Sequence, residues 1–218
     1  MKLLLTSAGI TNRTIAKALR SLTKKSFHQL KLVFIPTAVN PEKGDKRWFI
    51  QDLLNSRNLG FASLDIVDVS ALPQTIWERR IRDANIIQIG GGNTYYLAYW
   101  IRKSGLGNML PELLQTKIYV GTSAGSIVAS PSLTMSSSEP GTFKDERGLN
   151  LFKFHIRPHL YTPNFPQIKK KQLEKIALKL HAPIYYLDDQ SAIKVVDKKI
   201  EVVSEGDYFV INPPVDCS

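Results

Sequence analysis

Residues 117–131, KIYVGTSAGSIVASP, contain the pattern that decides the fold. The apolar residues 118–120 predict a buried strand, and the apolar residues 127–129 predict a short helix directly after it. Between them lies GTSAG, residues 121–125, a full match to G-x-S-x-G. Small residues on both sides of a serine allow the chain to turn sharply from strand to helix. We therefore expect the hydroxyl of Ser123 to stand above the edge of a sheet.

A serine in such a turn can be a catalytic nucleophile, or it can have only a structural role. As a nucleophile it would attack a carbonyl group, and the backbone N–H of Ala124 would bind the resulting oxyanion. As a structural residue Ser123 would only cap the helix that follows it. The pentapeptide is short and does not separate the two interpretations.

Apolar runs and amphipathic segments alternate along the rest of the chain. Strands are predicted at residues 2–6, 32–35, 64–67, 86–89, 184–187, 192–196 and 200–203. Helices are predicted after Asn12, around residues 49–54 with all four apolar side chains on one side, at 76–82, and at 169–180. This alternation predicts an α/β fold with a mostly parallel sheet covered on both faces. Ligands of such sheets bind beyond the carboxyl ends of the strands.

A second turn of small residues, Gly90-Gly91-Gly92-Asn93-Thr94, follows the predicted strand 86–89. Three glycines let a substrate approach the backbone closely, so Gly92 and Asn93 are candidate substrate-binding residues. The turn matches neither the P-loop nor G-x-G-x-x-G, which argues against phosphate binding. An oxyanion hole shared by the amides of Gly91 and Ala124 would explain both turns.

A serine nucleophile needs a base, and the chain has four histidines. His155, Arg157 and His159 lie on one face of a predicted strand at 154–159. His159 stands at the end of this strand, after a proline, and is the candidate base. Arg157 shares its face and is a candidate substrate-binding residue.

The acid that would orient the base is harder to assign. Glu139 is the nearest carboxylate after Ser123, and it would give the chain order Ser, acid, His found in sheet-based serine hydrolases. The alternative is that Glu139 is a surface residue and that a hydroxyl, an amide or water holds the base. The pair Asp188-Asp189 lies at a strand end, where we expect it to form a turn.

Length and composition limit the possibilities further. The chain has 218 residues, 43% of them hydrophobic, which predicts one domain over 1–218. The lysines are scattered apart from residues 169–171, so the net charge of +10 predicts a solvated surface and no nucleic-acid partner. No apolar run approaches the ~20 residues that cross a membrane, and the start lacks the long apolar stretch of a secretory signal.

The single cysteine, Cys217, excludes an internal disulfide, and no Cys/His metal motif is present. We therefore expect a cytoplasmic protein without metal or cofactor.

Six motifs together resemble peptidase family S51, which includes dipeptidase E and, more distantly, cyanophycinase. They span nearly the whole chain in the family's order: residues 5–7 (LTS), 35–38 (IPTA), 90–94 (GGGNT), 121–125 (GTSAG), 158–159 (PH) and 187–193 (LDDQSAI). The resemblance implies a three-layer, flavodoxin-like fold related to class I glutamine amidotransferases. It also implies Ser123 as nucleophile, His159 as base, and oxyanion donors at Gly91 and Ala124.

This resemblance carries expectations about the substrate. Dipeptidase E cleaves peptides with an N-terminal aspartate and needs no metal. Its third triad member is an aspartate that aligns near Ser138, with Glu139 next to it here. Arg157 replaces a neutral residue of the dipeptidase branch, so we expect a different substrate pocket.

The sequence thus predicts a serine peptidase that hydrolyses small peptides, in particular dipeptides that begin with an acidic residue, and that acts as a monomer or homodimer. Two alternatives stay open at this stage. One is a different hydrolase on the same fold, such as an esterase or a cyanophycinase-like enzyme. The other is a binding protein that has lost a complete triad.

Overall fold

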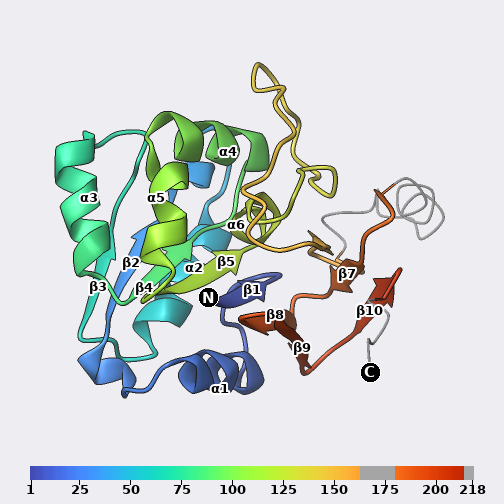
Figure 1. The fold of residues 1–218 in the computed structure, drawn as a ribbon, viewed down its shortest axis with the longest axis horizontal. Coiled ribbons are helices and arrows are strands. Elements are labelled where there is room, and N and C mark those ends of the chain that lie inside the picture. The colour runs from blue at the N-terminus through green and yellow to red at the C-terminus, as the bar shows by residue number, and fades with distance from the viewer. Residues whose placement is uncertain (163–179, 214–218) are drawn as a thin grey trace.

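The structure is a computed structural model that describes residues 1–162 and 180–213. Its main sheet has seven strands in the order β3-β2-β4-β5-β1-β8-β9 (Figure 1). These strands are β1 (Lys2–Thr6), β2 (Lys31–Ile35), β3 (Ser63–Ile66), β4 (Ile86–Ile89), β5 (Ile118–Thr122), β8 (Ser191–Val196) and β9 (Lys199–Ser204). The first five in spatial order are parallel, and β8 and β9 extend the sheet antiparallel. The predicted mostly parallel sheet is confirmed.

Helices cover both faces of this sheet and complete the three layers. One face carries α1 (Arg13–Leu22) and α2 (Arg47–Arg57). The other carries α3 (Gln74–Asp83), α4 (Thr94–Lys103), α5 (Leu106–Leu113) and α6 (Ala124–Val128). Short 3-10 helices lie at Phe27–Gln29 and Thr37–Val39. The predicted α/β sandwich is therefore confirmed.

The central strands β1, β2, β4 and β5 are mostly apolar because both of their faces are buried. In β1, Leu3 and Leu5 pack into the core under α3 to α6, whereas Leu4 packs into the core under α1 and α2. All three side chains are fully buried. None of the described helices is both long and apolar enough to cross a membrane.

A smaller sheet of β10 (Tyr208–Ile211), β7 (Ile184–Leu187) and β6 (His155–Arg157) lies beside the main one. Strands β6 and β7 run parallel, with Arg157 opposite Tyr186. The carboxyl ends of β6 and β7 therefore point the same way, and the loops that follow them meet. The predicted helix at 169–180 lies almost entirely outside the described residues.

The α2 helix is turned differently from the prediction. Two of its predicted inward side chains, Ile50 and Leu54, are exposed, whereas Asp52 and Ser56 are buried. The reason is a buried glutamine on β4: Ser56 Oγ donates to Gln88 Oε1 at 2.8 Å, and Gln88 Nε2 donates to Asp52 Oδ1 at 3.2 Å. Because these polar groups hydrogen-bond to one another, they can be buried. The pattern of apolar residues predicts a different side of α2 as the buried one.

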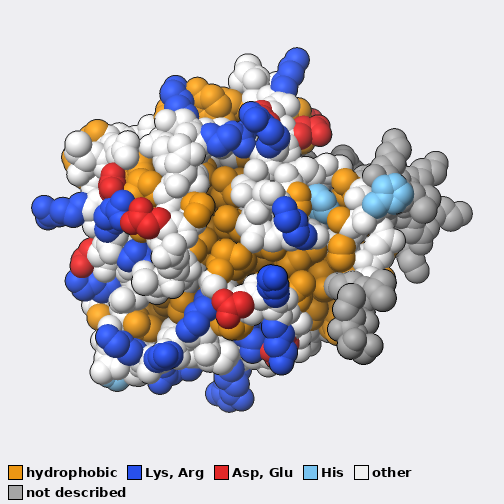
Figure 2. Space-filling model, in the orientation of Figure 1, with side chains coloured by type: hydrophobic (Ala, Val, Ile, Leu, Met, Phe, Trp, Pro, Cys, Tyr) orange, Lys and Arg blue, Asp and Glu red, His pale blue; other side chains and the backbone are white. Residues whose placement is uncertain are grey.

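Strand register brings the important turns to one edge. Thr6 of β1 pairs with Thr122 of β5, and Ile89 of β4 pairs with Gly121. The residues that follow these strands, including Ser7, the Gly90–Gly92 turn and Ser123, therefore lie at the same end of the sheet. Charge shows no such concentration on the face in Figure 2, where Lys and Arg side chains are spread among apolar and uncharged surface.

Candidate active site

Ser123 sits in a strained turn between β5 and α6. Its backbone has φ 48° and ψ −107°, a conformation that non-glycine residues rarely adopt. The turn is held by the Ser123 N–H, which donates to the Thr6 carbonyl at 3.1 Å. Strain of this kind persists only where the surroundings impose it, and it is common at functional sites.

The flanking glycines explain why the motif needs small residues. A Cβ on Gly125 would overlap the carbonyl oxygen of Ile89 in the neighbouring strand. A Cβ on Gly121 would come within 2.8 Å of the backbone of Gly125. The helix therefore packs directly on the strands, and no larger residue fits at either position.

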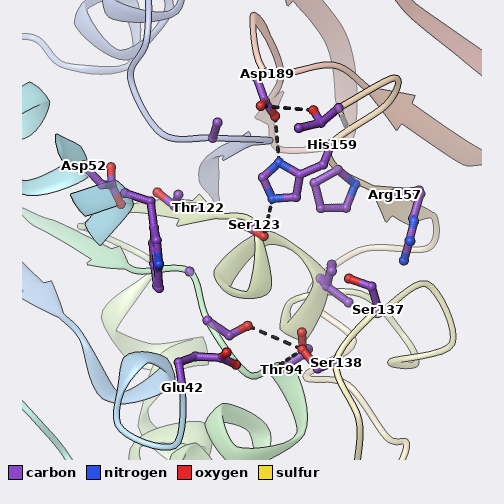
Figure 3. Close-up of a pocket in the computed structure, with 17 residues that line it drawn as sticks. Glu42, Asp52, Thr94, Thr122, Ser123, Ser137, Ser138, Arg157, His159 and Asp189 are labelled. Carbon is purple, nitrogen blue, oxygen red and sulfur yellow. Dashed lines mark hydrogen bonds and ion pairs between the residues drawn. The ribbon is translucent and has the colours of Figure 1, made fainter. Parts of the chain in front are cut away.

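The ring of His159 lies between Ser123 and Asp189 (Figure 3). Its Nε2 is 2.8 Å from Ser123 Oγ, and its Nδ1 is 2.7 Å from Asp189 Oδ1. His159 follows β6 and has a positive φ of 62°. Its backbone N–H donates to the hydroxyl of Ser7 at 2.8 Å, which ties this loop to the end of β1. Ser123, His159 and Asp189 thus form one continuous hydrogen-bonded line, the arrangement found in catalytic triads.

Asp189 is fixed by several donors. Besides His159, it accepts hydrogen bonds from Ser7 Oγ at 3.1 Å and Thr162 Oγ1 at 3.2 Å. Burial alone would raise the pKa of this carboxyl, but hydrogen bonds and charge from His159, with help from the two hydroxyls, leave the pKa below its usual value. Asp189 is therefore ionised at neutral pH and suited to stabilise a protonated imidazole.

The prediction that Glu139 orients His159 is corrected by this geometry. The Glu139 side chain is exposed, and its carbonyl accepts a hydrogen bond from Asn93 Nδ2 at 3.3 Å. The carboxylate against His159 belongs instead to Asp189. The sequence signal for this acid was the pair Asp188-Asp189 at a strand end, because the strand before it, β7, runs parallel to β6, the strand that precedes His159.

The two aspartates of that pair differ in role. Asp188 forms the predicted turn: its carboxylate accepts from the backbone N–H of Gln190 at 3.0 Å and of Asp207 at 2.6 Å. Asp189 instead points into the site, where its carboxylate contacts His159 (Figure 3). The turn prediction was therefore right for Asp188 and incomplete for Asp189.

The Gly90–Gly92 turn reaches the serine as expected. A Cβ on Gly91 would lie 3.4 Å from Cβ of Ser123, so the two backbones are close neighbours. Gly92 has φ +128°, and a Cβ there would overlap the Ala38 carbonyl. Asn93 caps α4, because its Oδ1 accepts from the Tyr96 N–H at 3.0 Å. Gly91 and Gly92 line the pocket beside Ser123, whereas the side chain of Asn93 is engaged in this cap.

A pocket of about 460 Å³ opens over Ser123 and His159. Trp48 is among the residues that line it. Asp52 lies on one side of the pocket, and Ser137 and Arg157 lie on the other (Figure 3). Within residues 1–162 and 180–213, no group of three or more His, Cys, Asp or Glu side chains is arranged to hold a metal ion.

The walls of this pocket carry two buried ionisable groups. Burial raises the pKa of Asp52 to about 7, against the lowering effect of polar neighbours including Gln88. Burial lowers the pKa of Arg157 to about 10. Sequence reasoning missed Asp52, since it lies on the side of α2 that was predicted to face solvent.

Comparison with known proteins agrees with the fold and the motifs. The family model described as peptidase family S51 matches residues 3–203. The chain belongs to peptidase family S51. It is therefore a peptidase, and the S51 resemblance of its motifs is confirmed over nearly its whole length.

Relatives of the S51 chain include bacterial peptidases. It is 27% identical to an uncharacterised peptidase of Pasteurella multocida over 75% of this chain and 80% of that protein. It is 29% identical to an uncharacterised peptidase of Listeria monocytogenes over 78% and 83%, respectively. It is also 31% identical to Peptidase E of Shewanella baltica over 72% and 65%.

Solved structures share the fold of this S51 chain. A crystal structure from Listeria monocytogenes superposes with a TM-score of 0.78 at 21% identity, covering 94% of this chain and 98% of that one. A peptidase from an acI-B1 Actinobacterium superposes with a TM-score of 0.73 at 20% identity, covering 98% and 91%. The flavodoxin-like three-layer architecture is thus shared with both.

Proposed function

We propose that this protein is a serine peptidase that hydrolyses small peptides, with Ser123 as nucleophile, His159 as base and Asp189 as the acid that orients it. The observation that carries this proposal is the line of contacts from Ser123 Oγ through the His159 ring to Asp189 Oδ1, at 2.8 and 2.7 Å. Both distances fall in the range in which protons are transferred or shared.

The first half of the reaction forms an acyl-enzyme. Ser123 Oγ attacks the carbonyl carbon of the scissile bond while His159 Nε2 takes the hydroxyl proton. The negative charge that develops on the carbonyl oxygen is bound by the backbone N–H groups of Gly91 and Ala124. Asp189 stabilises the imidazolium ion and keeps Nδ1 protonated when the ring is neutral. His159 then donates its proton to the leaving amine, and the peptide bond breaks.

The second half returns the serine. A water molecule loses a proton to His159 and attacks the ester carbonyl, and the same two amides bind the second oxyanion. Collapse of this intermediate releases the acid product, and His159 returns the proton to Ser123 Oγ. His159 passes on each proton that it accepts, the first to the leaving amine and the second to Ser123 Oγ, so the ring ends the cycle in its starting state.

Small peptides are the substrates that the site suits best. A pocket of about 460 Å³ accommodates a few residues and does not suit a folded protein chain. We further propose that the first residue of the peptide is acidic, on the basis of the S51 resemblance and of the cationic Arg157 in the pocket wall. The cytoplasmic location and the state of assembly stay predictions.

Replacing Ser123 with alanine tests the proposal. Ser123→Ala is expected to abolish hydrolysis of a dipeptide panel while its thermal unfolding midpoint stays close to that of the wild type. A serine-directed fluorophosphonate is expected to label the wild type at Ser123 and to leave the variant unlabelled. Dipeptide hydrolysis by a clean preparation of the variant would refute the assignment.

The same panel separates the alternatives. It includes simple esters and branched Asp-Arg peptides beside ordinary dipeptides. Faster turnover of esters or branched peptides would indicate a different hydrolase on this fold. A wild-type protein that neither turns over any substrate nor reacts with the probe would be a binding protein.

A further inference from the structure

Arg157 is a buried cation without a carboxylate partner. It lies at the end of β6, lines the pocket, and is only 7% exposed. Among the described residues, its guanidinium donates one hydrogen bond, from Nη1 to the carbonyl of Met135, and its Nε has no acceptor. A guanidinium has five N–H donors, so most of its hydrogen-bonding capacity is unused.

The acids of the pocket do not compensate this charge. Asp189 is engaged by His159, and Asp52 lies on the opposite side of the Ser123–His159 pair (Figure 3). Glu42 lies near Thr94 and Ser138 in the same view, away from Arg157. No ion pair joins Arg157 to an acid anywhere in the described part of the chain.

Burial of this kind is unfavourable unless an anion binds. Taking a charged group out of water costs several kcal/mol in a protein interior. Burial lowers the pKa of Arg157 only to about 10, so the side chain keeps its charge at neutral pH. Tyr186 lies opposite Arg157 across the β6–β7 pair, and Met135 accepts from the guanidinium through its backbone carbonyl, so neither residue supplies a carboxylate. The pocket therefore presents a desolvated positive charge to whatever enters it.

We propose that Arg157 binds a carboxylate of the peptide substrate and thereby determines which peptides the site accepts. This inference rests on the proposed function, since it assumes that the pocket over Ser123 binds peptides. A planar guanidinium pairs with a carboxylate through two parallel hydrogen bonds, which gives selectivity as well as affinity. The carboxylate belongs either to an acidic side chain in the first residue or to the free C-terminus of a dipeptide.

Binding measurements on an inactive background test this assignment without depending on catalysis. Ser123→Ala and Ser123→Ala/Arg157→Met are titrated by calorimetry with Asp-Leu, Asn-Leu and Asp-Leu amide. Methionine approximates the length of arginine and removes its charge and donors. Loss of one partner of a buried charge pair predicts that Asp-Leu binds the double variant about 100-fold more weakly.

The two neutralised peptides identify the carboxylate. If Arg157 reads the acidic side chain, Asn-Leu binds both proteins equally, and Asp-Leu amide behaves as Asp-Leu does. If Arg157 reads the C-terminus, Asp-Leu amide binds both proteins equally, and Asn-Leu behaves as Asp-Leu does. Equal weakening of all three peptides, unchanged binding of all three, or no binding to the Ser123→Ala protein would overturn the proposal.

Failure of the proposed function gives a different result. In that case the wild type would bind Asp-Leu through Arg157 yet release no amine from it. Folding is followed separately by thermal unfolding of Arg157→Met, which is expected at the same temperature as the wild type or higher because a buried charge is removed. If that variant does not fold, Arg157→Lys replaces it, and the preference for the carboxylate peptide is expected to fall about tenfold because lysine lacks the planar fork.

Discussion

Replacing Asp189 with asparagine tests the contact on which the proposed mechanism depends most. In the wild type, Asp189 Oδ1 accepts from His159 Nδ1 at 2.7 Å, and this contact fixes Nε2 as the atom that receives the proton of Ser123. An asparagine amide has nearly the same shape but no charge, and it can present an N–H to Nδ1. The ring would then carry its proton on Nε2, the wrong atom for a base.

The expected loss is large. The equivalent substitution in a serine protease triad lowers kcat about 10⁴-fold. At 1.36 kcal/mol for each factor of ten, this is about 5.5 kcal/mol of transition-state stabilisation. Folding is expected to change little, because the hydroxyls of Ser7 and Thr162 that donate to Asp189 can also pair with an amide. The loss would therefore appear in kcat and not in the unfolding midpoint.

The assay is release of free amine from a dipeptide at saturating concentration and neutral pH. Glu139→Gln is the matched control, because it also neutralises one carboxylate, and Glu139 is exposed and does not meet the His159 ring. Its kcat is expected to stay within about twofold of the wild type, in line with the small effects of exposed substitutions. An Asp189→Asn enzyme with more than a tenth of wild-type kcat, or a Glu139→Gln enzyme that is equally impaired, would refute the reasoning.

Four further substitutions test other parts of the structure. Because the folded-state pKa of Asp52 is raised to about 7, the folded protein holds a proton that the unfolded chain releases above about pH 4. Urea unfolding should therefore show wild-type stability falling by roughly 2–3 kcal/mol from pH 5 to pH 8, with no such fall in Asp52→Asn. Gly125→Ala is expected to lower stability by about 3 kcal/mol or more, because its Cβ would overlap strand backbone. Gly91→Ala should fold but lose activity, because the atom nearest to its added Cβ, Ser123 Cβ, is 3.4 Å away. Similar unfolding midpoints for the two glycine variants would contradict this reading. Ser7→Ala leaves the His159 N–H without its acceptor, so kcat should fall about tenfold with KM unchanged, and a kcat equal to wild type would exclude a positioning role.

Local patterns were sufficient for most of the architecture. The predicted strands are present with their ends shifted by at most two residues, because apolar runs between turn residues are a local property. The turn at Ser123 and the turn at Gly91 were placed correctly beside each other, since parallel strands bring their carboxyl ends to one edge. The α5 helix and the β10 strand were not predicted, and Pro111 lies inside α5.

Two features depended on contacts that no local pattern contains. Glu139 was preferred because it is close to Ser123 in the chain, whereas Asp189 reaches His159 through the pairing of β6 with β7. The orientation of α2 was predicted from its apolar residues alone, whereas Gln88 of β4 provides polar partners that draw Asp52 and Ser56 inward. In both places, a polar contact between residues far apart in the chain determines the structure. For this reason the carboxylate nearest to Ser123 in the chain was the wrong choice of acid, and the most apolar side of α2 was the wrong choice of buried side.

The site combines residues that are synthesised early with residues that are synthesised late. Ser7 and Asp189, which hydrogen-bond to each other, are separated by 182 positions, and β8 completes the sheet by pairing with β1. A nascent chain that already displays the serine turn thus still lacks the carboxylate and the strand beside its first one. We therefore expect any fragment that ends before Asp189 to be inactive, because it lacks both the carboxylate that contacts His159 and the strand that pairs with β1.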